Sequence, residues 1–433
     1  MKLWQKETTV DALIETFTIG NDPDFDLQLA RYDVQGTSAH IKMLTSIGLL
    51  TEAELQQLEA GLEAIAAVIE AGEFKIEPGV EDVHSQVELL LTRKLGEVGK
   101  KIHSGRSRND QVLVDLRLFF RAEIREIASL LDALFATLLA NSERYQGVLM
   151  PGYTHTQVAM VSSFGLWFGG YAEALVDDLA LLQSVHKINN QNPLGSAAGY
   201  GSSFPLDRKL TTELLGFDDL AYNSINAQLG RGKTEQFISF ALAGISSTLG
   251  KLAADIVLFS NENYRFLTLP DAFTTGSSIM PHKKNPDVFE LIRGHCNLLQ
   301  SLPAQVSMLN ANLISGYHRD YQLLKQAIFP ALANLKNCLR LTERSLQELR
   351  VSPDILADEK YRYLYTVEAV NERVLAGTPF REAYQQVGAQ IEAGKFTYDG
   401  ELHHTHEGSI GNLCLEEIRG KFERQLKGFG GGI

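Results

Sequence analysis

The apolar positions of this chain recur mostly with the spacing of α-helices. Between residues 51 and 72, leucine or isoleucine at 55, 58, 62, 65 and 69 falls on one stripe, as in an amphipathic helix. Thr51 with Glu54 forms a capping box at its start, and Gly72 is suited to its end. Residues 111–143 contain neither glycine nor proline and keep the same spacing. We therefore expect one long bundle helix there.

Three further segments carry the same pattern. They are Phe164–Asn189, Thr234–Asn263 and Asp287–Asn312, the last interrupted by Pro303. No clear alternation with a period of two, which would indicate strands, competes with them. The pattern therefore predicts an all-α protein built around long helices.

Polar segments separate these helices and carry most of the candidate chemistry. Most are expected at helix ends, where exposed N–H groups can bind anions. They are EDVHS (81–85), HSGRSRNDQV (103–112), GYTHTQ (152–157), PLGSAAGYGSS (193–203), GSSIMPHKKNP (276–286) and YHRDYQLLK (317–325).

The segment from Thr275 to Pro286 combines a glycine, two serines, two lysines and an asparagine. Gly276 permits backbone conformations closed to other residues, so that nearby N–H groups could converge on a carboxylate. Lys283 and Lys284 add positive charge where negative charge would develop in a reaction. Taken alone, the segment is either an anion-binding loop that carries a base or a solvated basic turn.

The charge of the chain restricts the partners that it can have. With 40 basic and 53 acidic residues its formal net charge is -13, which argues against nucleic acid because phosphate binding needs a basic face. The basic motifs are therefore local, as expected for a pocket with cationic walls that binds a small polycarboxylate.

The cellular compartment is indicated by the cysteines and by the N-terminal residues. No apolar run reaches membrane-spanning length, and the opening residues lack the apolar core of a signal peptide. The three widely spaced cysteines argue against a disulfide framework. We expect a reduced, cytoplasmic setting and no membrane partner.

Taken together, GSSIMPHKKNP, SRNDQ and GYTHTQ resemble the fumarase/aspartase superfamily over nearly the whole chain. GRSRNDQV, PLGSAAG and YHRDYQLLK resemble, within it, the argininosuccinate lyase family. The resemblance implies three mostly helical domains, here residues 1–106, 107–357 and 358–433, with the central bundle forming the core of a homotetramer. It also implies active sites assembled from three subunits.

The activity that the resemblance implies is the cleavage of argininosuccinate to arginine and fumarate. The proton to be removed is on the carbon beside a carboxylate and is only weakly acidic. Its removal needs a base, together with positive charge and N–H donors that stabilise the negative charge formed. Ser277 matches the family's catalytic serine and is the expected base, with Ser278 as fallback. Taken without the resemblance, Ser277 could also be a helix-capping hydroxyl.

Three other residues complete the expected catalytic set. Lys283 would stabilise the intermediate, whereas Lys284 is expected to be a solvated neighbour. His155 matches the histidine that could protonate the leaving nitrogen or only position it, since imidazole titrates near neutral pH. Glu290 matches the carboxylate that pairs with this histidine and fixes its tautomer.

Substrate binding is assigned through the same resemblance. The residues concerned offer donors or charges suited to a carboxylate, and Arg108 could bind one bidentately. They are Ser107, Arg108, Asn109, Thr154, Asn285, Tyr317, Gln322, Lys325, Arg231 and His84. Asp33 also matches a family position, and for it and His84 a purely structural role is an equal alternative.

Several positions depart from the family's pattern. Asp22 lies where a substrate-binding serine is common, and an ionised carboxylate cannot donate a hydrogen bond to a carboxylate. Asn226 and Gly232 replace frequent acidic residues, and Leu323 and Leu324 replace an acidic pair. These departures concern substrate affinity rather than the type of reaction.

Two other features are interpreted without a ligand. The cluster of His403, His404 and His406 is expected to be a solvated loop rather than a metal site. The glycines of AAGYGSS lack the strand and helix context of a dinucleotide loop, and no cofactor is implied. The rival functions are another fumarate-releasing lyase, such as an adenylosuccinate lyase, and an inactive structural paralogue.

Overall fold

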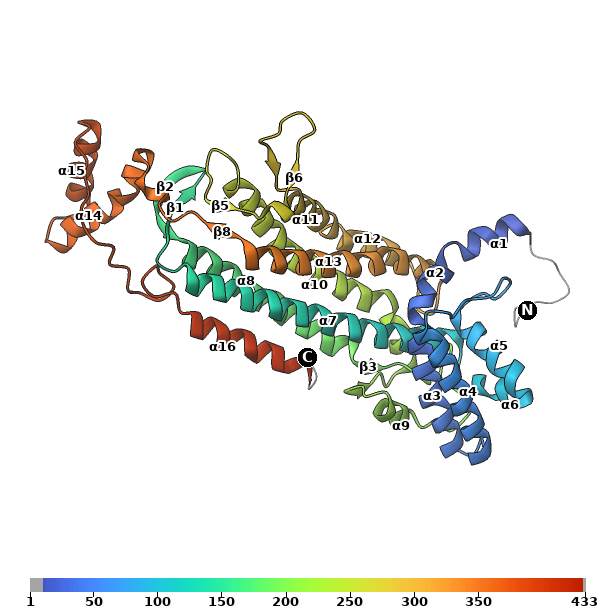
Figure 1. The fold of residues 1–433 in the computed structure, drawn as a ribbon. Helices are drawn as coiled ribbons and strands as arrows, with labels where there is room; N and C mark the ends of the chain where they lie inside the picture. The colour runs from blue at the N-terminus through green and yellow to red at the C-terminus, as the bar shows by residue number, and fades with distance from the viewer. Residues whose placement is uncertain (1–10, 431–433) are drawn as a thin grey trace.

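The computed structural model of the chain describes residues 11–430. Long helices lie side by side in an elongated bundle, with smaller groups of helices at its ends (Figure 1). The bundle helices are α7 (Arg108–Arg144), α8 (Phe164–Asn189), α10 (Ser224–Phe259), α11 (Asp287–Leu299), α12 (Leu302–Asn310) and α13 (Leu323–Glu348). The predicted all-α architecture with a central long-helix bundle is confirmed.

Helix α7 forms the spine of the molecule. It has 37 residues and starts at Ser107, whose side chain makes a capping box with Asp110. It packs against α8, α13 and α3, and its core-facing Ile124, Ile127 and Leu131 are fully buried. The prediction of a helix over 111–143 was therefore short by a few residues at the N-terminus, where polar SRND hides the start of the apolar stripe.

Helix α10 differs from the prediction of 234–263 because it begins at Ser224 and bends. Arg231 (φ -68°, ψ 133°) and Gly232 (φ 78°) have non-helical backbone inside it. A Cβ at position 232 would overlap the side chain of Asn310, and a positive φ is strained for any other residue. Gly232 is therefore required by the bend.

Helix α10 is also long and apolar enough, by length and composition alone, to cross a membrane. It packs instead against α8, α11, α12 and α13 within the bundle. Core helices of soluble proteins have the same composition, so this helix is explained by its place in the fold.

The N-terminal group of helices lies beside the start of α7. It comprises α1 (Ala12–Ile19), α2 (Asp22–Asp26), η1 (Leu27–Leu29), α3 (Ala30–Ser46), α4 (Glu52–Glu70), α5 (Val83–Leu95), α6 (Glu97–Lys100) and η2 (Lys101–His103). The predicted capping box of Thr51 and Glu54 is present at the start of α4. Helix α9 (Arg208–Leu214) packs against α3.

The C-terminal part first leaves the bundle and then returns. Helices α14 (Thr366–Leu375) and α15 (Phe380–Glu392) enclose a small core of their own, which includes Ala383 and Val387. Helix α16 (Leu415–Leu426) then runs back along the bundle, where Phe422 stacks on Phe135 with ring centroids 3.8 Å apart. The 3-10 helices here are η5 (Ile355–Ala357), η6 (Glu359–Tyr365) and η7 (Lys427–Phe429).

Short strands occur where the sequence pattern indicated none. The described residues contain β1 (Leu149–Thr154) paired with β2 (Gln157–Ser163), β3 (Gln191–Asn192) with β4 (Asp219–Leu220), β5 (Leu267–Thr268) with β8 (Arg350–Val351), and β6 (Thr275–Gly276) with β7 (Lys284–Asn285). Most have two residues, too few for alternation to be visible. The 3-10 helix η3 (Asp271–Phe273) precedes the GSSIMPHKKNP segment, and η4 (Arg319–Gln322) lies within YHRDYQLLK.

Candidate active site

A cavity of about 230 Å³ lies where the start of α7 meets α2, η4 and the start of α13. Its lining includes six of the ten residues expected to bind substrate. It is lined by Ile19, Asp22, Asp26, Glu81, Asp82, Arg108, Asn109, Val112, Arg231, Tyr317, Arg319, Gln322 and Lys325. Four of these side chains are basic, as expected of cationic walls, but four are acidic. Each basic group is held by carboxylates.

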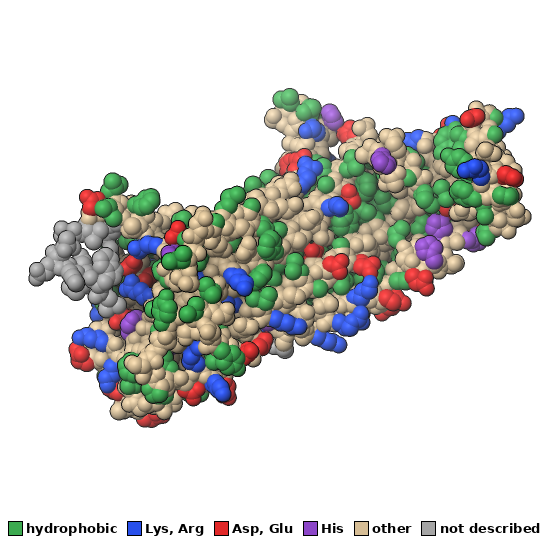
Figure 2. All heavy atoms as spheres, turned by 180° about the vertical axis from the view of Figure 1, so that it is seen from behind, with side chains coloured by type: hydrophobic (Ala, Val, Ile, Leu, Met, Phe, Trp, Pro, Cys, Tyr) green, Lys and Arg blue, Asp and Glu red, His purple; other side chains and the backbone are tan. Residues whose placement is uncertain are grey.

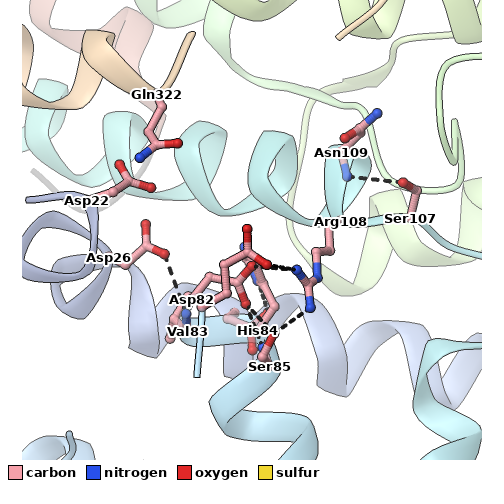
Figure 3. A network of polar contacts seen from close by, with 12 residues as sticks. Asp22, Asp26, Asp82, Val83, His84, Ser85, Ser107, Arg108, Asn109 and Gln322 are labelled. Carbon is pink, nitrogen blue, oxygen red and sulfur yellow. Dashed lines mark hydrogen bonds and ion pairs between the residues drawn. The ribbon is translucent and has the colours of Figure 1, made fainter. Parts of the chain in front are cut away.

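Arg108 lies on the first turn of α7, and acidic residues of the EDVHS segment already engage it (Figure 3). Its Nη1 is 3.0 Å from Glu81 and 3.3 Å from Asp82, and its Nη2 donates to Ser85 Oγ at 2.7 Å. Asn109 lines the cavity, whereas the Ser107 hydroxyl accepts the Asn109 backbone N–H at 3.2 Å. Arg108 is thus fixed in position before any substrate carboxylate arrives.

The next residue, Asp110, joins two of the polar segments. It is fully buried, and its carboxylate accepts the backbone N–H groups of Gly195 and Ala197, each at 2.9 Å. Burial raises the pKa of Asp110 to about 6, although these hydrogen bonds favour the ionised form. The PLGSAAG segment is therefore hydrogen-bonded to the first turn of α7 and fixes its position.

Lys325, on the first turn of α13, lies between two carboxylates of α2. Its Nζ is 2.8 Å from Asp22 and also bonds Asp26. Only 5% of the Lys325 side chain is exposed, compared with 19% of Asp22. Burial raises the pKa of Asp22 to about 6 against the lowering effect of Lys325. Asp22, at the position of the family's serine, is therefore part of the cavity wall.

Arg231 reaches the cavity because of the bend in α10. Its Nη2 donates to the Tyr321 carbonyl at 2.8 Å, and its Nε lies 3.0 Å from Glu235. Gln322 also lines the cavity, but its amide nitrogen donates to the carbonyls of Thr18 and Ile19 at 3.2 and 2.9 Å. Gln322 thereby attaches the end of α1 to the cavity wall. Tyr317 also lines the cavity.

His84 does not line the cavity. It is 4% exposed, and its Nδ1 is 2.8 Å from Asp33 and 3.4 Å from Asp115. Burial alone would lower the pKa of His84, but the two carboxylates raise it to about 10. These three residues are close enough to be considered as metal ligands. Both carboxylates face the same ring nitrogen, however, which suits a buried imidazolium better than a metal.

The GSSIMPHKKNP segment forms the β6–β7 hairpin and its exposed tip (Figure 1). Gly276 lies within β6 and is not among the described glycines with positive φ, so the expectation that its special conformation gathers N–H groups was wrong. The turn at Ser277 does so instead: its Oγ accepts the N–H groups of Ile279 and Met280 at 3.4 and 3.1 Å. Lys284 pairs with Asp271 and is not simply solvated.

The GYTHTQ segment is the turn of the β1–β2 hairpin, and all residues from Thr154 to Gln157 are exposed. His155 (φ 52°) and Thr156 (φ 59°) have left-handed backbone, which a two-residue hairpin normally assigns to asparagine and glycine. For a β-branched residue such as Thr156 this is a real strain, of the kind that persists where function needs it.

Within one chain these parts do not meet. The cavity lies at the start of α7 and the β1–β2 hairpin lies at the other end of the bundle, while β6 lies between them (Figure 1). Among the described residues, no hydrogen bond or ion pair joins Glu290 to His155, and Glu290 is exposed on the first turn of α11. Ser277, Lys283 and His155 are likewise absent from the cavity lining.

The residues that sequence reasoning did not assign are mainly acidic. Glu81, Asp82, Asp26 and Arg319 line the cavity. The first two belong to EDVHS and the last to YHRDYQLLK, so position in a polar segment was an available signal. Asp26 had no such signal because it lies within a helix.

The histidine cluster near the C-terminus differs partly from the solvated loop that was expected. His403 and His406 are exposed, but His404 Nε2 lies 2.9 Å from the buried Glu368. All three line a second cavity of about 310 Å³, together with Glu372 and Glu401.

Comparisons with known proteins agree over nearly the whole chain. A family model described as "Lyase" matches residues 5–300. The argininosuccinate lyase of Bacteroides thetaiotaomicron is 60% identical over 428 residues, which are 99% of this chain and 96% of that protein. The argininosuccinate lyase of Thermotoga neapolitana is 42% identical over 386 residues, covering 89% of this chain and 97% of that protein.

Solved structures share the fold at lower identity. An EDDS lyase variant with bound fumarate has a TM-score of 0.75 at 22% identity, covering 95% of this chain and 90% of that one. The class II fumarase of Schistosoma mansoni has a TM-score of 0.74 at 16% identity, with coverage of 93% and 90%. The bundle is thus a known architecture.

Proposed function

Because the chain belongs to the argininosuccinate lyase family, we propose that it cleaves argininosuccinate to arginine and fumarate, as a step of arginine biosynthesis. The observation that carries this is the 60% identity to a named argininosuccinate lyase over 99% of the chain. The reaction is an acid–base catalysed β-elimination. A base takes the proton from the carbon beside a carboxylate, the bond to the guanidino nitrogen breaks, and an acid returns a proton to that nitrogen.

Ser277 is the proposed base. A serine hydroxyl is too weak an acid to ionise unaided, so its alkoxide needs donors. The N–H groups of Ile279 and Met280, directed at Oγ, would supply them. Lys283 on the same hairpin would bind the carboxylate on which charge develops, with Asn285 beside it.

His155 is the proposed acid or its positioning residue, and Thr154 a neighbouring substrate contact. The strained backbone at His155 and Thr156 supports a functional role for this turn. Glu290 of a second copy would pair with His155, since the two residues have no contact within one chain.

The geometry favours a site shared between copies of the chain. Helix α7 has 37 residues, which corresponds to about 55 Å at 1.5 Å per residue. Arg108 lies at its first residue, while His155 follows its last by a single strand. No small substrate spans that distance, which supports a site in which the cavity and the hairpin belong to different copies. A homotetramer with sites built from three subunits would provide this arrangement.

Exposed apolar side chains on the bundle support the same assembly. Leu291 and Leu298, seven residues apart on α11, are 65% and 69% exposed, and Met308 of α12 is 76% exposed. Phe240 of α10 is 46% exposed. Hydrophobic side chains are visible along the bundle in Figure 2. Such surfaces are typical of helices that pack against other subunits.

In this proposal the first cavity binds the arginine part of the substrate. The proposed substrate contacts come from the start of α7 and from the residues around the cavity: Ser107, Arg108, Asn109, Arg231, Tyr317, Gln322 and Lys325. His84 would act indirectly, because it is buried outside the cavity lining. The cysteines are free, consistent with a cytoplasmic enzyme. No cofactor takes part.

The test is fumarate release from purified protein, followed by ultraviolet absorbance, with argininosuccinate, adenylosuccinate and malate in parallel. We expect turnover of argininosuccinate alone. Turnover of another of these substrates would show that the chain is a lyase of the superfamily with a different substrate specificity. A folded protein inactive on all three would support the inactive paralogue.

A further inference from the structure

Asp22 gives the cavity a feature that the family pattern does not explain. It is the first residue of α2, lines the cavity and keeps 19% of its side chain exposed. Asp26, four residues later, is 3% exposed, and its carboxylate is occupied by Lys325 and by the backbone N–H of Val83 at 3.4 Å. Both Asp22 and Asp26 line the cavity, but Asp22 is the more exposed of the two and keeps free hydrogen-bonding capacity toward a ligand.

The local charge favours a cation rather than a second anion. Lys325 faces Asp22 and Asp26, and the nearby Arg231 is paired with Glu235. The three carboxylates outnumber the two cations, so this corner carries a net negative charge while Asp22 is ionised. Each carboxylate oxygen can accept two hydrogen bonds, and the contact with Lys325 at 2.8 Å uses only part of that capacity. A substrate carboxylate placed against Asp22 would be repelled, whereas an ammonium group would be held by a charge-assisted hydrogen bond.

An α-amino acid group matches this corner in both of its charges. It presents an ammonium and a carboxylate on one carbon, and Asp22 and Lys325 present the opposite charges 2.8 Å apart. A guanidinium would satisfy Asp22 but would offer Lys325 nothing. The succinyl end, with two carboxylates, would not suit Asp22 at all.

We propose that Asp22 is a specificity-determining residue that binds the α-ammonium group of the substrate's arginine part, with Lys325 beside it for the α-carboxylate. This assignment rests on the proposed function and adds to it the orientation of the substrate. It also means that the enzyme selects an α-amino acid rather than any guanidino-succinate.

The test compares argininosuccinate with its analogue that has hydrogen in place of the α-ammonium group, both followed by fumarate release. The variants are Asp22→Asn and, in case the amide disturbs packing, Asp22→Ser. The matched control is Asp24→Asn, an exposed aspartate on the same helix. Lys325 keeps Asp26 as its partner in all of them.

We expect the wild type to prefer argininosuccinate by on the order of 30-fold in kcat/KM, because a hydrogen bond to a charged group is lost with the analogue. Asp22→Asn and Asp22→Ser should lose a similar factor on argininosuccinate, mainly through KM, and little on the analogue. Asp24→Asn should behave as the wild type. The preference for the α-amino acid would then disappear only in the Asp22 variants.

Two results would overturn this assignment while leaving the proposed function intact. Equal losses on both substrates would show that Asp22 supports the fold or binds the guanidino group. An undiminished preference in both Asp22 variants would show that another residue binds the ammonium. Wild-type protein that releases fumarate from neither substrate would instead overturn the proposed function together with this assignment.

Discussion

At the scale of single residues, the cavity is governed by carboxylates that hold cations in place. Arg108 is held by Glu81 and Asp82, and Lys325 by Asp22 and Asp26. A fixed cation loses less side-chain entropy when substrate binds. A consequence is that protonation of one of these carboxylates within the working pH range would change the affinity for substrate.

Asp22 should therefore make substrate binding depend on pH. It faces Asp26 on its own helix, Lys325 on α13 and Arg231 on α10, and burial raises its pKa to about 6. Below that pH Asp22 becomes neutral and can no longer hold an ammonium, so kcat/KM for argininosuccinate should fall roughly tenfold per pH unit on this limb.

The measurement is the pH profile of kcat/KM for the wild type and for Asp22→Asn between pH 5 and about 8. In the variant this limb should be missing. A limb that persists unchanged in the variant would assign it to another group.

The sequence predicted many of the basic and polar residues of the cavity, but not the residues that pair with them. Arg108, Gln322 and Lys325 lie in the polar segments and Arg231 was named through the family resemblance, and all four line the cavity. Of their acidic partners only Asp22 was singled out, as a departure from the family pattern, because a carboxylate that holds a cation looks like any surface acid until the fold brings the two together. For His84, substrate contact and a structural role were equal alternatives; the side chain is buried and absent from the cavity lining, and burial is not visible in EDVHS.

At the scale of elements, hydrophobic periodicity located the long helices well. The prediction for α8 matches its bounds, because Ser163 caps its start and apolar positions continue to its end. The bend in α10 was not predicted, since Gly232 in mid-helix looks merely unfavourable. The β1–β2 hairpin was missed because its turn carries His155 and Thr156 instead of a recognisable turn pair.

Gly232→Ala should therefore be costly. Alanine would have to adopt a φ of 78° and its Cβ would overlap Asn310, so we expect a loss of roughly 2 to 4 kcal/mol in the free energy of unfolding. Displacement of the neighbouring Arg231 should lower kcat/KM as well.

Urea unfolding measures the first effect and fumarate release the second. The control is Gly244→Ala on the same helix, where a Cβ meets only ordinary contacts at 3.5 Å and beyond. That variant should be unchanged or about 1 kcal/mol more stable. Equal effects of the two substitutions would show that the bend does not need glycine.

At the scale of the whole molecule, the length of α7 dictates how a complete site is built. One end of the chain carries the cavity and the other carries His155 (Figure 1). Two inactive variants, Lys325→Met and His155→Asn, should therefore complement each other when they are co-expressed. Random mixing should leave roughly a quarter of the sites with neither defect, and activity should return to about that fraction.

Light scattering of the mixture should give about four times the 47.9 kDa mass of one chain. Each variant alone should assemble equally and stay inactive. Assembly without recovery of activity would indicate that each site lies within a single chain.

The central claim is that this chain cleaves argininosuccinate with Ser277 as base, and the most direct test is the joint release of arginine and fumarate by the wild type, Ser277→Ala and Ser278→Ala. The two serines are neighbours on the same exposed tip, but only the Ser277 hydroxyl accepts two backbone N–H groups. We predict equimolar products from the wild type, a loss of at least about 10³-fold in kcat for Ser277→Ala, and a much smaller effect for Ser278→Ala. Near-normal turnover by Ser277→Ala, or a larger loss for Ser278→Ala, would contradict this assignment.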